Sequence, residues 1–158
     1  DALILYKPHP DVEAGLRPGA VPDAAGIADA VLTRTDPVTA LAAADRVWTM
    51  TSALGFEALL RGVPVTCLGR PFYAGWGLTE DRGAPLPRRT ARPDVIALAH
   101  AALVAYPRYH DPVTNRPCPV EVAVDRLVAG TIPRPSRANR ALAKLQGAFA
   151  GQSWLWRR

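Results

Sequence analysis

At the centre of this sequence stands Thr51-Ser-Ala-Leu-Gly-Phe-Glu-Ala-Leu-Leu-Arg-Gly-Val-Pro-Val65, which predicts one helix joining two strands. Thr51 and Ser52 are residue types that cap the start of a helix. Residues 53–61 follow with apolar side chains at helical spacing, and Gly62 ends the pattern. This pattern predicts a short, capped and largely buried helix.

Apolar runs on both sides of this helix predict strands over residues 46–50 and 63–68. A helix that begins directly after a strand presents free backbone N–H groups and the positive end of its dipole. The hydroxyl groups of Thr51 and Ser52 lie at that same end, so the stretch predicts an anion site. Glu57, in the second turn, is within reach of a sugar hydroxyl beside the anion. An ordinary capped helix in an α/β protein is the alternative.

Composition and charge indicate a globular protein with an anionic partner. The chain has 158 residues, of which 49% are hydrophobic and 21% charged, and this is enough for one domain with a core. Its 19 Lys and Arg residues against 14 Asp and Glu give a net charge of +5. That excess favours a phosphate-bearing substrate, an acidic polymer or a membrane surface. Nucleic acid is not predicted, because basic residues are not interleaved with aromatic ones on any element.

The cysteines, the absence of a long apolar run and the start of the chain indicate in which cellular compartment the protein is expected. Cys67 and Cys118 have neither metal-ligand spacing nor a disulfide pattern, which favours free thiols in a reducing compartment. The sequence has no apolar run near the roughly 20 residues of a membrane span and no secretory signal. A cytoplasmic location is therefore expected. Because the chain opens directly on a strand, we expect it to be a fragment that lacks an N-terminal half.

The N-terminal third alternates strands and helices. Strands are predicted over residues 2–6 and 29–33, and a helix over residues 37–44 precedes the strand before the central helix. Residues 11–26 are predicted to be a loop with at most a short helix near residues 12–16. This alternation predicts parallel pairing with right-handed crossovers. The expected fold class is α/β, a Rossmann-like three-layer parallel sheet.

Two loops that follow predicted strands carry candidate ligand contacts. In Lys7-Pro-His-Pro10 the prolines fix the backbone, so that Lys7 and His9 can point at one anion; a proline-rich turn with a solvated histidine is the alternative. The loop over residues 69–81 is rich in glycine and aromatic residues, which suit stacking on a base or a sugar. Rings folded into the core are the alternative there. The pair Arg88-Arg89 suits a carboxylate or a phosphate, although such pairs are often simply solvated.

The C-terminal part is predicted to be mainly helical. A domain is expected over residues 1–130, followed over residues 131–158 by a linker and an amphipathic basic helix. That last helix either packs on a partner domain or lies on a membrane surface. The remaining elements predicted are a helix over residues 93–106, a loop over 106–112, a turn over 114–117, a helix over 119–129, and the final helix over 138–156.

Four motifs in series carry a family resemblance over roughly residues 1–130. They are Lys7-Pro-His-Pro10, Thr51–Gly62, Pro71-Phe-Tyr-Ala-Gly-Trp-Gly-Leu-Thr79 and Tyr106-Pro-Arg-Tyr109. In order and spacing they resemble the KpsC-type capsule polysaccharide β-Kdo transferases. The resemblance implies the nucleotide-sugar-binding half of a GT-B-like glycosyltransferase, with the acceptor-binding half upstream. It also implies a retaining transfer of β-Kdo from CMP-β-Kdo to a lipid-linked saccharide, for capsule polysaccharide synthesis and export.

The same resemblance implies roles for individual residues. It implies that His9 contacts the donor phosphate, with Lys7 nearby, and that Thr51 and Ser52 hold phosphate oxygens as the leaving group develops charge. Glu57 is then expected to bind the ribose. The rest of the expected donor contacts are Gly55 and Phe56 in the central helix, Tyr73, Gly75 and Trp76 in a wall near the base or the Kdo, and Arg88 or Arg89 at the Kdo carboxylate.

The resemblance also implies what this chain lacks. Kdo transfer needs an acidic residue, which we expect before residue 1, and Glu80 and Asp81 are not assigned that role. The chain alone is therefore expected to bind CMP weakly and to transfer nothing. No cofactor or metal is expected, because Lys7 and His9 can offset the single phosphate of CMP. Peripheral contact with the inner membrane is a further expectation for the basic C-terminal helix.

Two other functions remain open on the sequence alone. One is a related GT-B enzyme, either sialyltransferase-like or specific for a UDP-sugar. The other is a non-catalytic module, which binds carbohydrate or serves as a scaffold in the capsule export machinery. Binding of CMP compared with UDP separates the first alternative, and absence of any nucleotide binding supports the second.

Overall fold

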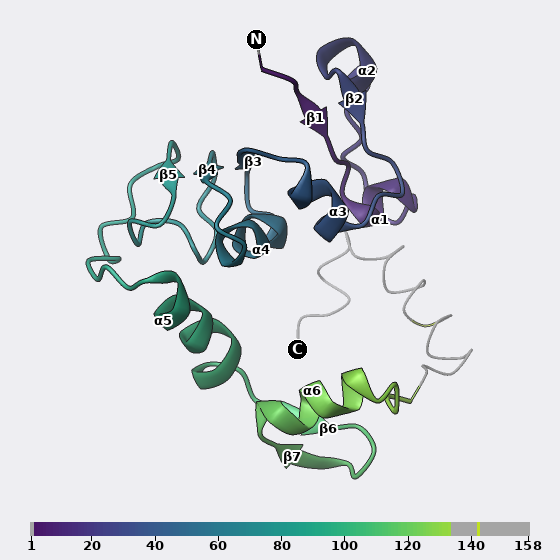
Figure 1. The fold of residues 1–158 in the computed structure, drawn as a ribbon, viewed down its shortest axis with the longest axis vertical. Coiled ribbons are helices and arrows are strands. Elements are labelled where there is room, and N and C mark those ends of the chain that lie inside the picture. Colours follow the sequence, from purple (N-terminus) through teal and green to yellow (C-terminus); the bar gives the residue numbers. More distant parts are fainter. Residues whose placement is uncertain (1, 134–141, 143–158) are drawn as a thin grey trace. The chain divides into compact units, whose positions relative to one another are not determined.

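The computed structural model describes residues 2–133 and residue 142, and the chain divides into two compact units. The first unit contains residues 1–36 and 133–158, and the second contains residues 37–132 (Figure 1). The predicted C-terminal helix over residues 138–156 lies outside the described residues, apart from residue 142. Among the described residues, no helix has the length and apolar character needed to cross a membrane.

The first unit holds a short parallel strand pair. Strand β1 (Leu5–Tyr6) pairs with β2 (Ala30–Val31), which confirms the predicted parallel arrangement, although both strands are shorter than expected. Helix α1 (Pro10–Glu13) begins earlier than predicted because the His9 side chain caps it. Helix α2 (Ala24–Ile27) was not predicted; its residues lie mostly in a stretch expected to be a loop.

The second unit is built on a three-stranded parallel sheet. Strands β3 (Val47–Thr49), β4 (Val65–Cys67) and β5 (Glu80–Asp81) lie side by side in that order. The first two confirm the strands predicted around the central helix. The third was predicted as loop, because two exposed carboxylates give no apolar strand pattern.

The core of the second unit lies between this sheet and helix α4 (Ala53–Leu60), which packs against β3 and β4 (Figure 1). Helix α3 (Pro37–Ala42) contributes Leu41 to the same core. The α4 helix was predicted with its N-cap and with a stop at Gly62, whose φ of +73° favours glycine. The buried cluster consists of Leu41, Val47, Phe56, Ala58, Val65, Cys67, Tyr73, Ala74 and Leu98.

A helix follows in the position predicted for residues 93–106. It is α5 (Val95–His100), capped by the Asp94 side chain and continued by a π-helical segment, η1 (Ala101–Ala105). Helix α5 contributes Leu98 to the buried cluster and lies against α4. The α/β class predicted from the sequence is thus confirmed around the central helix.

The segment after η1 forms an antiparallel hairpin, so the predicted loop over residues 106–112 was wrong in part. Strands β6 (Tyr109–Asp111) and β7 (Arg116–Cys118) pair across a turn in which Asn115 has φ of +56°. Proline within β7 had suggested a turn instead of a strand; a two-stranded hairpin tolerates it because both of its strands are edges. The turn predicted over residues 114–117 was right in part, because residues 114 and 115 lie in the turn whereas residues 116 and 117 belong to β7.

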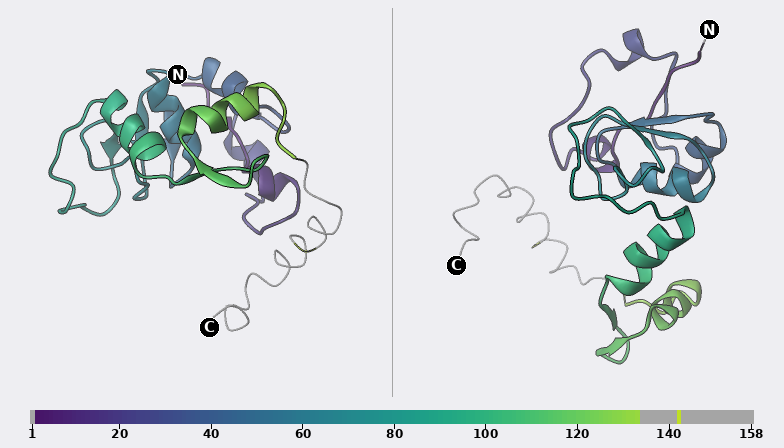
Figure 2. Two further views of the ribbon diagram at one scale, coloured as in Figure 1. Left: turned by 90° about the horizontal axis from the view of Figure 1, so that it is seen from below. Right: turned by 90° about the vertical axis from the view of Figure 1, so that its left-hand side faces the viewer.

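Helix α6 (Val120–Val128), also predicted, packs against β6 (Figure 2). The two elements are joined by Asp111, which is 2% exposed and accepts hydrogen bonds from Arg126 Nε at 3.1 Å and Nη2 at 2.9 Å. The Arg126 guanidinium, with the backbone N–H of Val113, holds the pKa of the Asp111 carboxyl well below its usual range. This ion pair therefore fixes the helix on the hairpin.

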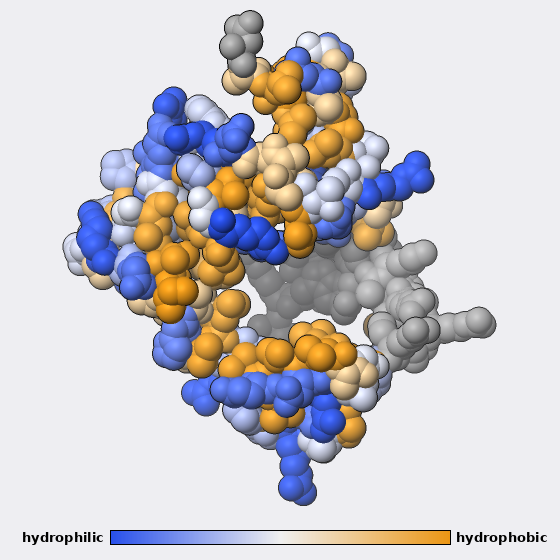
Figure 3. All heavy atoms as spheres, viewed as in Figure 1, coloured by the Kyte–Doolittle hydropathy of each residue, from blue (hydrophilic) through white to orange (hydrophobic). Residues whose placement is uncertain are grey.

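One side of α6 remains exposed and apolar. Val124, Leu127 and Val128 are 49%, 66% and 84% exposed. Figure 3 shows hydrophobic surface gathered over this part of the chain. Glu121 and Asp125 are exposed on the same helix, as expected for a solvated carboxylate pair.

Candidate functional site

The start of α4 is capped as the sequence predicts. Ser52 has extended backbone angles, and its hydroxyl oxygen accepts a hydrogen bond from the Leu54 N–H at 3.2 Å. The Ser52 N–H donates to Thr49 Oγ1 at 3.2 Å, and the Gly55 N–H donates to the Ser52 carbonyl at 3.1 Å. The cap therefore uses most of the backbone N–H groups at this end of the helix.

One N–H group at this end stays open. Within the described residues the Ala53 N–H donates to no acceptor, whereas its neighbours on both sides do. Thr51, Ser52 and Ala53 are all exposed. This end of α4 thus offers one open backbone N–H and the positive end of the helix dipole, beside two exposed residues that carry hydroxyl groups.

Glu57 lies one turn further along α4 and is half-buried. Its carboxylate is 4.0 Å from Arg61 Nη1, a loose ion pair between two side chains that are each about 40% exposed. The same Arg61 nitrogen donates to the Glu57 carbonyl at 3.1 Å. The carboxylate of Glu57 is therefore accessible and weakly held.

Gly55 and Phe56 do not occupy the positions expected of ligand contacts. Both are buried, and Phe56 packs against the rings of Phe72 and Tyr73, with ring centroids 4.9 and 6.3 Å away. A Cβ atom at Gly55 would lie 2.3 Å from the Tyr73 hydroxyl. Both residues therefore belong to the core beneath the start of α4. They have almost no exposed surface with which to contact a ligand.

Tyr73 likewise lies in the core, not in the wall of an open site. Its side chain has no exposed surface, and its hydroxyl donates to the Ser52 carbonyl at 2.5 Å. Burial raises the pKa of Tyr73 to about 12, with the neighbouring Cys67 adding to the rise and a hydrogen bond with Thr49 opposing it. The phenol thus stays protonated at neutral pH and serves as a permanent hydrogen-bond donor to the α4 cap.

The loop after β4 is closed by an arginine that was predicted to bind a ligand. Arg89 Nη1 donates to the carbonyls of Pro71 at 2.6 Å and Ala74 at 2.5 Å. Its guanidinium carbon lies 5.4 Å from the centre of the Trp76 ring, at cation–π distance. Because those contacts occupy the Arg89 guanidinium, the residue acts as a clamp on the loop. Arg88 beside it is exposed, and within the described residues it has no hydrogen bond or ion pair.

Gly75 and Trp76 lie at the surface of this clamped loop. Gly75 has φ of +80°, and its N–H donates to Asp81 Oδ2 at 2.8 Å. Trp76 is half-buried, and its indole N–H donates to the Phe72 carbonyl at 2.7 Å. The indole therefore has a fixed orientation and keeps part of its surface open.

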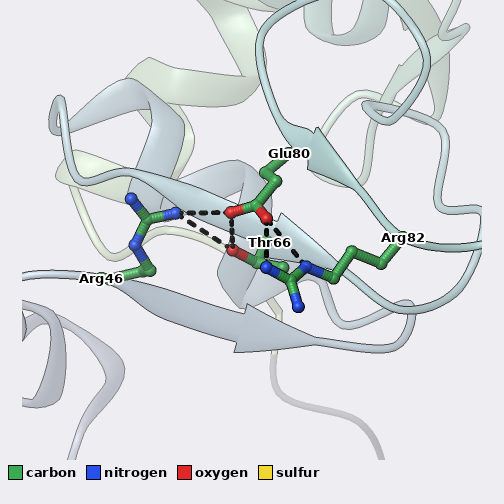
Figure 4. Close-up of polar contacts among 4 residues, drawn as sticks. All are labelled: Arg46, Thr66, Glu80 and Arg82. Carbon is green, nitrogen blue, oxygen red and sulfur yellow. Dashed lines mark hydrogen bonds and ion pairs between the residues drawn. The ribbon is translucent and has the colours of Figure 1, made fainter.

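The two carboxylates after this loop are engaged in internal contacts. Glu80 accepts hydrogen bonds from Arg46 at 2.9 Å and from Arg82 at 2.7 Å, and it also contacts the Thr66 hydroxyl (Figure 4). The hydrogen bond from Arg82, followed by that from Thr66, lowers the pKa of Glu80. Asp81 accepts from the Thr79 hydroxyl at 2.7 Å as well as from Gly75. Neither carboxylate is therefore placed as a free base.

In the first unit, His9 and Lys7 follow β1 as predicted. His9 Nδ1 accepts a hydrogen bond from the Asp11 N–H at 3.1 Å, so the ring proton belongs on Nε2, and the side chain is 44% exposed. The Lys7 ammonium lies 3.9 Å from Glu13, and its side chain is only 10% exposed. His9 is therefore oriented as a donor through Nε2, whereas Lys7 is largely occupied by its carboxylate partner.

Sequence reasoning missed the contact from Tyr73 to Ser52 and the clamp formed by Arg89. A glycine beside Phe56 in a predicted helix was the available signal, because it marks a close approach by another group. A metal ion has no candidate set of three or more His, Cys, Asp or Glu side chains in the described part of the chain. Both cysteines are free, Cys67 buried and Cys118 half-buried.

Comparison with known proteins gives a consistent result. A family described as capsule polysaccharide biosynthesis protein matches residues 1–109. The capsule polysaccharide modification protein LipA of Neisseria meningitidis serogroup A / serotype 4A is 48% identical over 130 residues, which cover 81% of this chain and 18% of LipA. The lipopolysaccharide-processing protein LpsZ of Rhizobium meliloti is 47% identical over 111 residues, 69% of this chain and 25% of LpsZ.

Two solved structures of KpsC from Thermosulfurimonas dismutans are also similar. The first, named a beta Kdo 2,7 transferase, matches with a TM-score of 0.70 and 38% identity over 83% of this chain and 41% of that one. The second, named a beta Kdo 2,4 transferase, matches with a TM-score of 0.68 and 36% identity over 80% and 40%. The chain thus spans well under half the length of each solved protein, consistent with one Rossmann-like half of a GT-B-like module.

Proposed function

Because the chain belongs to the family of capsule polysaccharide biosynthesis proteins, we propose that it is the donor-binding part of a glycosyltransferase. The donor is CMP-β-Kdo, and β-Kdo is transferred with retention to a lipid-linked saccharide during capsule polysaccharide synthesis. Similarity to the two KpsC structures named as Kdo transferases supports this proposal. Those two names differ in linkage and match this chain almost equally well, so the proposal leaves the linkage open.

The observation that carries the proposal is the exposed start of α4. The open Ala53 N–H and the hydroxyl groups of Thr51 and Ser52 stand directly after β3. A CMP-sugar has a single phosphate, and one amide with two hydroxyl groups suits an anion of that size. In open parallel sheets ligands bind beyond the carboxyl ends of the strands, and this is such a position.

The chemistry proposed for these groups is stabilisation of the leaving phosphate. During transfer, the bond between the anomeric carbon of Kdo and the phosphate oxygen breaks, and CMP leaves with the electron pair and a second negative charge. Donors already oriented toward that oxygen stabilise the transition state more than the bound substrate. The anomeric carbon of Kdo forms its new bond to the acceptor oxygen, and the acceptor hydroxyl gives up its proton. A carboxylate that we expect outside this chain serves as the base or the nucleophile. We therefore expect the chain alone to bind CMP without transferring Kdo.

His9, in the first unit, is proposed to donate a hydrogen bond from Nε2 to a ligand phosphate. The hydrogen bond from the Asp11 N–H to Nδ1 supports this proposal, because it leaves Nε2 as the ring nitrogen that can donate. Lys7 is proposed to contribute only through its charge, since Glu13 lies 3.9 Å from its ammonium group. Titration of CMP into His9→Gln tests this proposal, and an unchanged affinity would contradict it.

The remaining direct contacts are proposed from accessibility. Glu57 is proposed to accept hydrogen bonds from the ribose hydroxyls, and Trp76 to stack on the base or the sugar. Arg88 is proposed to pair with the Kdo carboxylate, because its neighbour Arg89 is occupied by backbone carbonyls. Gly75 is proposed only to let the loop backbone approach the ligand.

The experiment that tests the proposal is calorimetric binding of CMP and of UDP to this chain. We expect CMP to bind and UDP to bind much more weakly or not at all. Ser52→Ala should weaken CMP binding about tenfold, since a charge-assisted hydrogen bond is lost. The matched control is Asp94→Ala, which removes the cap of α5, where Asp94 accepts from the Ala97 N–H at 2.7 Å. That variant should lose about 1 kcal/mol of stability without losing CMP affinity.

Three outcomes contradict the proposal. Tighter binding of UDP than of CMP indicates a UDP-sugar enzyme, and no binding of either nucleotide indicates a non-catalytic module. Equal losses of CMP affinity in Ser52→Ala and Asp94→Ala place the phosphate elsewhere. Independence from metal is a separate proposal, and loss of CMP binding on addition of a chelator would contradict it.

A further inference from the structure

The buried hydroxyl of Tyr73 contacts the backbone at the start of α4. It donates to the Ser52 carbonyl at 2.5 Å, although 21 residues separate the two in sequence. Gly55 makes room for it, because a Cβ atom there would lie 2.3 Å from the hydroxyl oxygen and 2.8 Å from the ring carbon that bears it. The contact therefore depends on one glycine and one phenol that fit together.

The hydrogen bond from Tyr73 to the Ser52 carbonyl also affects the direction of the Ala53 N–H, which lies in the same peptide group. The peptide between Ser52 and Ala53 is planar and trans, so its C=O and N–H point in opposite directions. The Ser52 carbonyl accepts hydrogen bonds from the phenol and from the Gly55 N–H, and while these hold it the Ala53 N–H is directed outward. That N–H is the open donor of the candidate phosphate site.

The rest of the loop that carries Tyr73 is held independently of this contact. Arg89 binds the carbonyls of Pro71 and Ala74, on either side of Tyr73, and Asp81 binds the N–H of Gly75. Removal of the hydroxyl alone should leave the loop and the ring packing in place. The effect of the hydroxyl can thus be separated from the effect of the ring.

From this geometry we infer that Tyr73 is a positioning residue, which acts through the Ser52–Ala53 peptide to aim the Ala53 N–H at the donor phosphate. The inference rests on the proposed function for the identity of the ligand. Tyr73 itself touches no ligand, since its side chain has no exposed surface. The phosphate of a nucleotide is the group affected, whereas the base and the sugar are not.

The test compares Tyr73→Phe with a matched control, Tyr109→Phe. Tyr109 donates from its hydroxyl to the Leu103 carbonyl at 2.5 Å, so the control removes the same kind of hydrogen bond outside the α4 site. CMP and cytidine are titrated into each variant and followed by NMR. We expect Tyr73→Phe to weaken CMP binding about five- to tenfold and to leave cytidine binding unchanged. Tyr109→Phe should change neither.

A second readout needs no ligand. Hydrogen exchange at the backbone N–H groups of Leu54 and Gly55 reports on the cap, because both donate to Ser52. Exchange there should be faster in Tyr73→Phe than in the unmodified chain and unchanged in Tyr109→Phe.

Each outcome supports or overturns the inference. Unchanged exchange at Leu54 and Gly55 overturns it, and so does an equal loss of CMP and cytidine affinity, which is the sign of a general structural role. If the unmodified chain binds no nucleotide, the proposed function fails. Exchange at those two N–H groups still decides whether Tyr73 orients the cap.

Discussion

Gly55 and Tyr73 share a space in which a further methyl group does not fit. We predict that Gly55→Ala lowers the free energy of unfolding by about 1–2 kcal/mol, since overpacking costs about 1–3 kcal/mol and alanine returns up to about 1 kcal/mol of helix propensity. Urea denaturation measures this difference. Adding Tyr73→Phe removes the closest atom in the clash and should recover part of the loss. A Gly55→Ala variant more stable than the unmodified chain would show that the phenol moves away freely.

The raised pKa of Tyr73 predicts a loss of stability in alkaline solution. In the folded chain the phenol titrates at about 12, and in the unfolded chain at about 10. Between these values the folded state binds more protons than the unfolded state, so stability falls as pH rises through this window. In Tyr73→Phe that part of the slope should disappear. Denaturation at a series of pH values measures this dependence of stability on pH. Identical slopes in the unmodified chain and in Tyr73→Phe would contradict the burial of the phenol.

At this scale, the sequence predicted which residues carry hydroxyl groups at the cap but not which side chains are buried. Ser52 was recognised because N-cap residues follow a local rule. Tyr73 and Arg89 were assigned to a ligand because a loop sequence does not specify the direction of its side chains. Their actual partners, the carbonyls of Ser52, Pro71 and Ala74, are backbone groups that no sequence pattern reveals.

At the scale of elements, the loop over residues 71–76 depends on one guanidinium group. We predict that Arg89→Ala loosens it, because two hydrogen bonds from a charged donor, each worth roughly 1.5–3 kcal/mol, are lost together with the contact to Trp76. The measurement is hydrogen exchange of the backbone N–H groups in this loop. Arg88→Ala is the control, since that neighbour is exposed, and equal effects of the two variants would contradict the clamp.

The hairpin and α6 give a prediction for acid solution. The pKa of Asp111 is lowered in the folded chain, chiefly by hydrogen bonds from Arg126. Its contribution to stability is therefore present above the unfolded pKa of about 3.9 and is lost as pH falls below that value. In Asp111→Asn this loss should be absent and stability at neutral pH should already be lower. Acid denaturation followed by circular dichroism checks both effects, and a parallel pH dependence in the two chains would contradict them.

Elements with a strong local pattern could be predicted, and those without one could not. Helices α4 and α6 have caps or helical spacing of apolar residues, and β3 and β4 are short apolar runs between turn signals. Strand β5 consists of two carboxylates and exists because it pairs with β4. The hairpin strands were missed because Pro117 lies in one of them and neither has apolar alternation.

At the scale of the whole molecule, binding of a nucleotide is expected to raise thermal stability. At a concentration 100 times its Kd, CMP should stabilise the chain by about 2.7 kcal/mol, which corresponds to a rise in Tm of roughly 5–10 °C for a chain of this size. Differential scanning fluorimetry with CMP, cytidine and UDP measures the rise. A larger rise with UDP than with CMP would contradict the proposed donor.

The share of its relatives' length that this chain covers limits which parts of the proposed reaction it can perform. It covers 18% of LipA and 41% of the KpsC chain named as a 2,7 transferase, and it retains the segment that contains α4 and the loop clamped by Arg89. The part described here therefore accounts for a proposed donor site, while the acceptor, the linkage and the catalytic carboxylate are expected in the remaining length of such proteins.

The fit between Gly55 and Tyr73 also restricts how related sequences diverge. A mutation that adds a side chain at position 55 is tolerated only where position 73 has already lost its hydroxyl group or become smaller. Across species, the two positions should therefore covary, although 17 residues lie between them in this chain. Lineages with alanine at position 55 and tyrosine at position 73 should be rare or should carry a compensating change nearby.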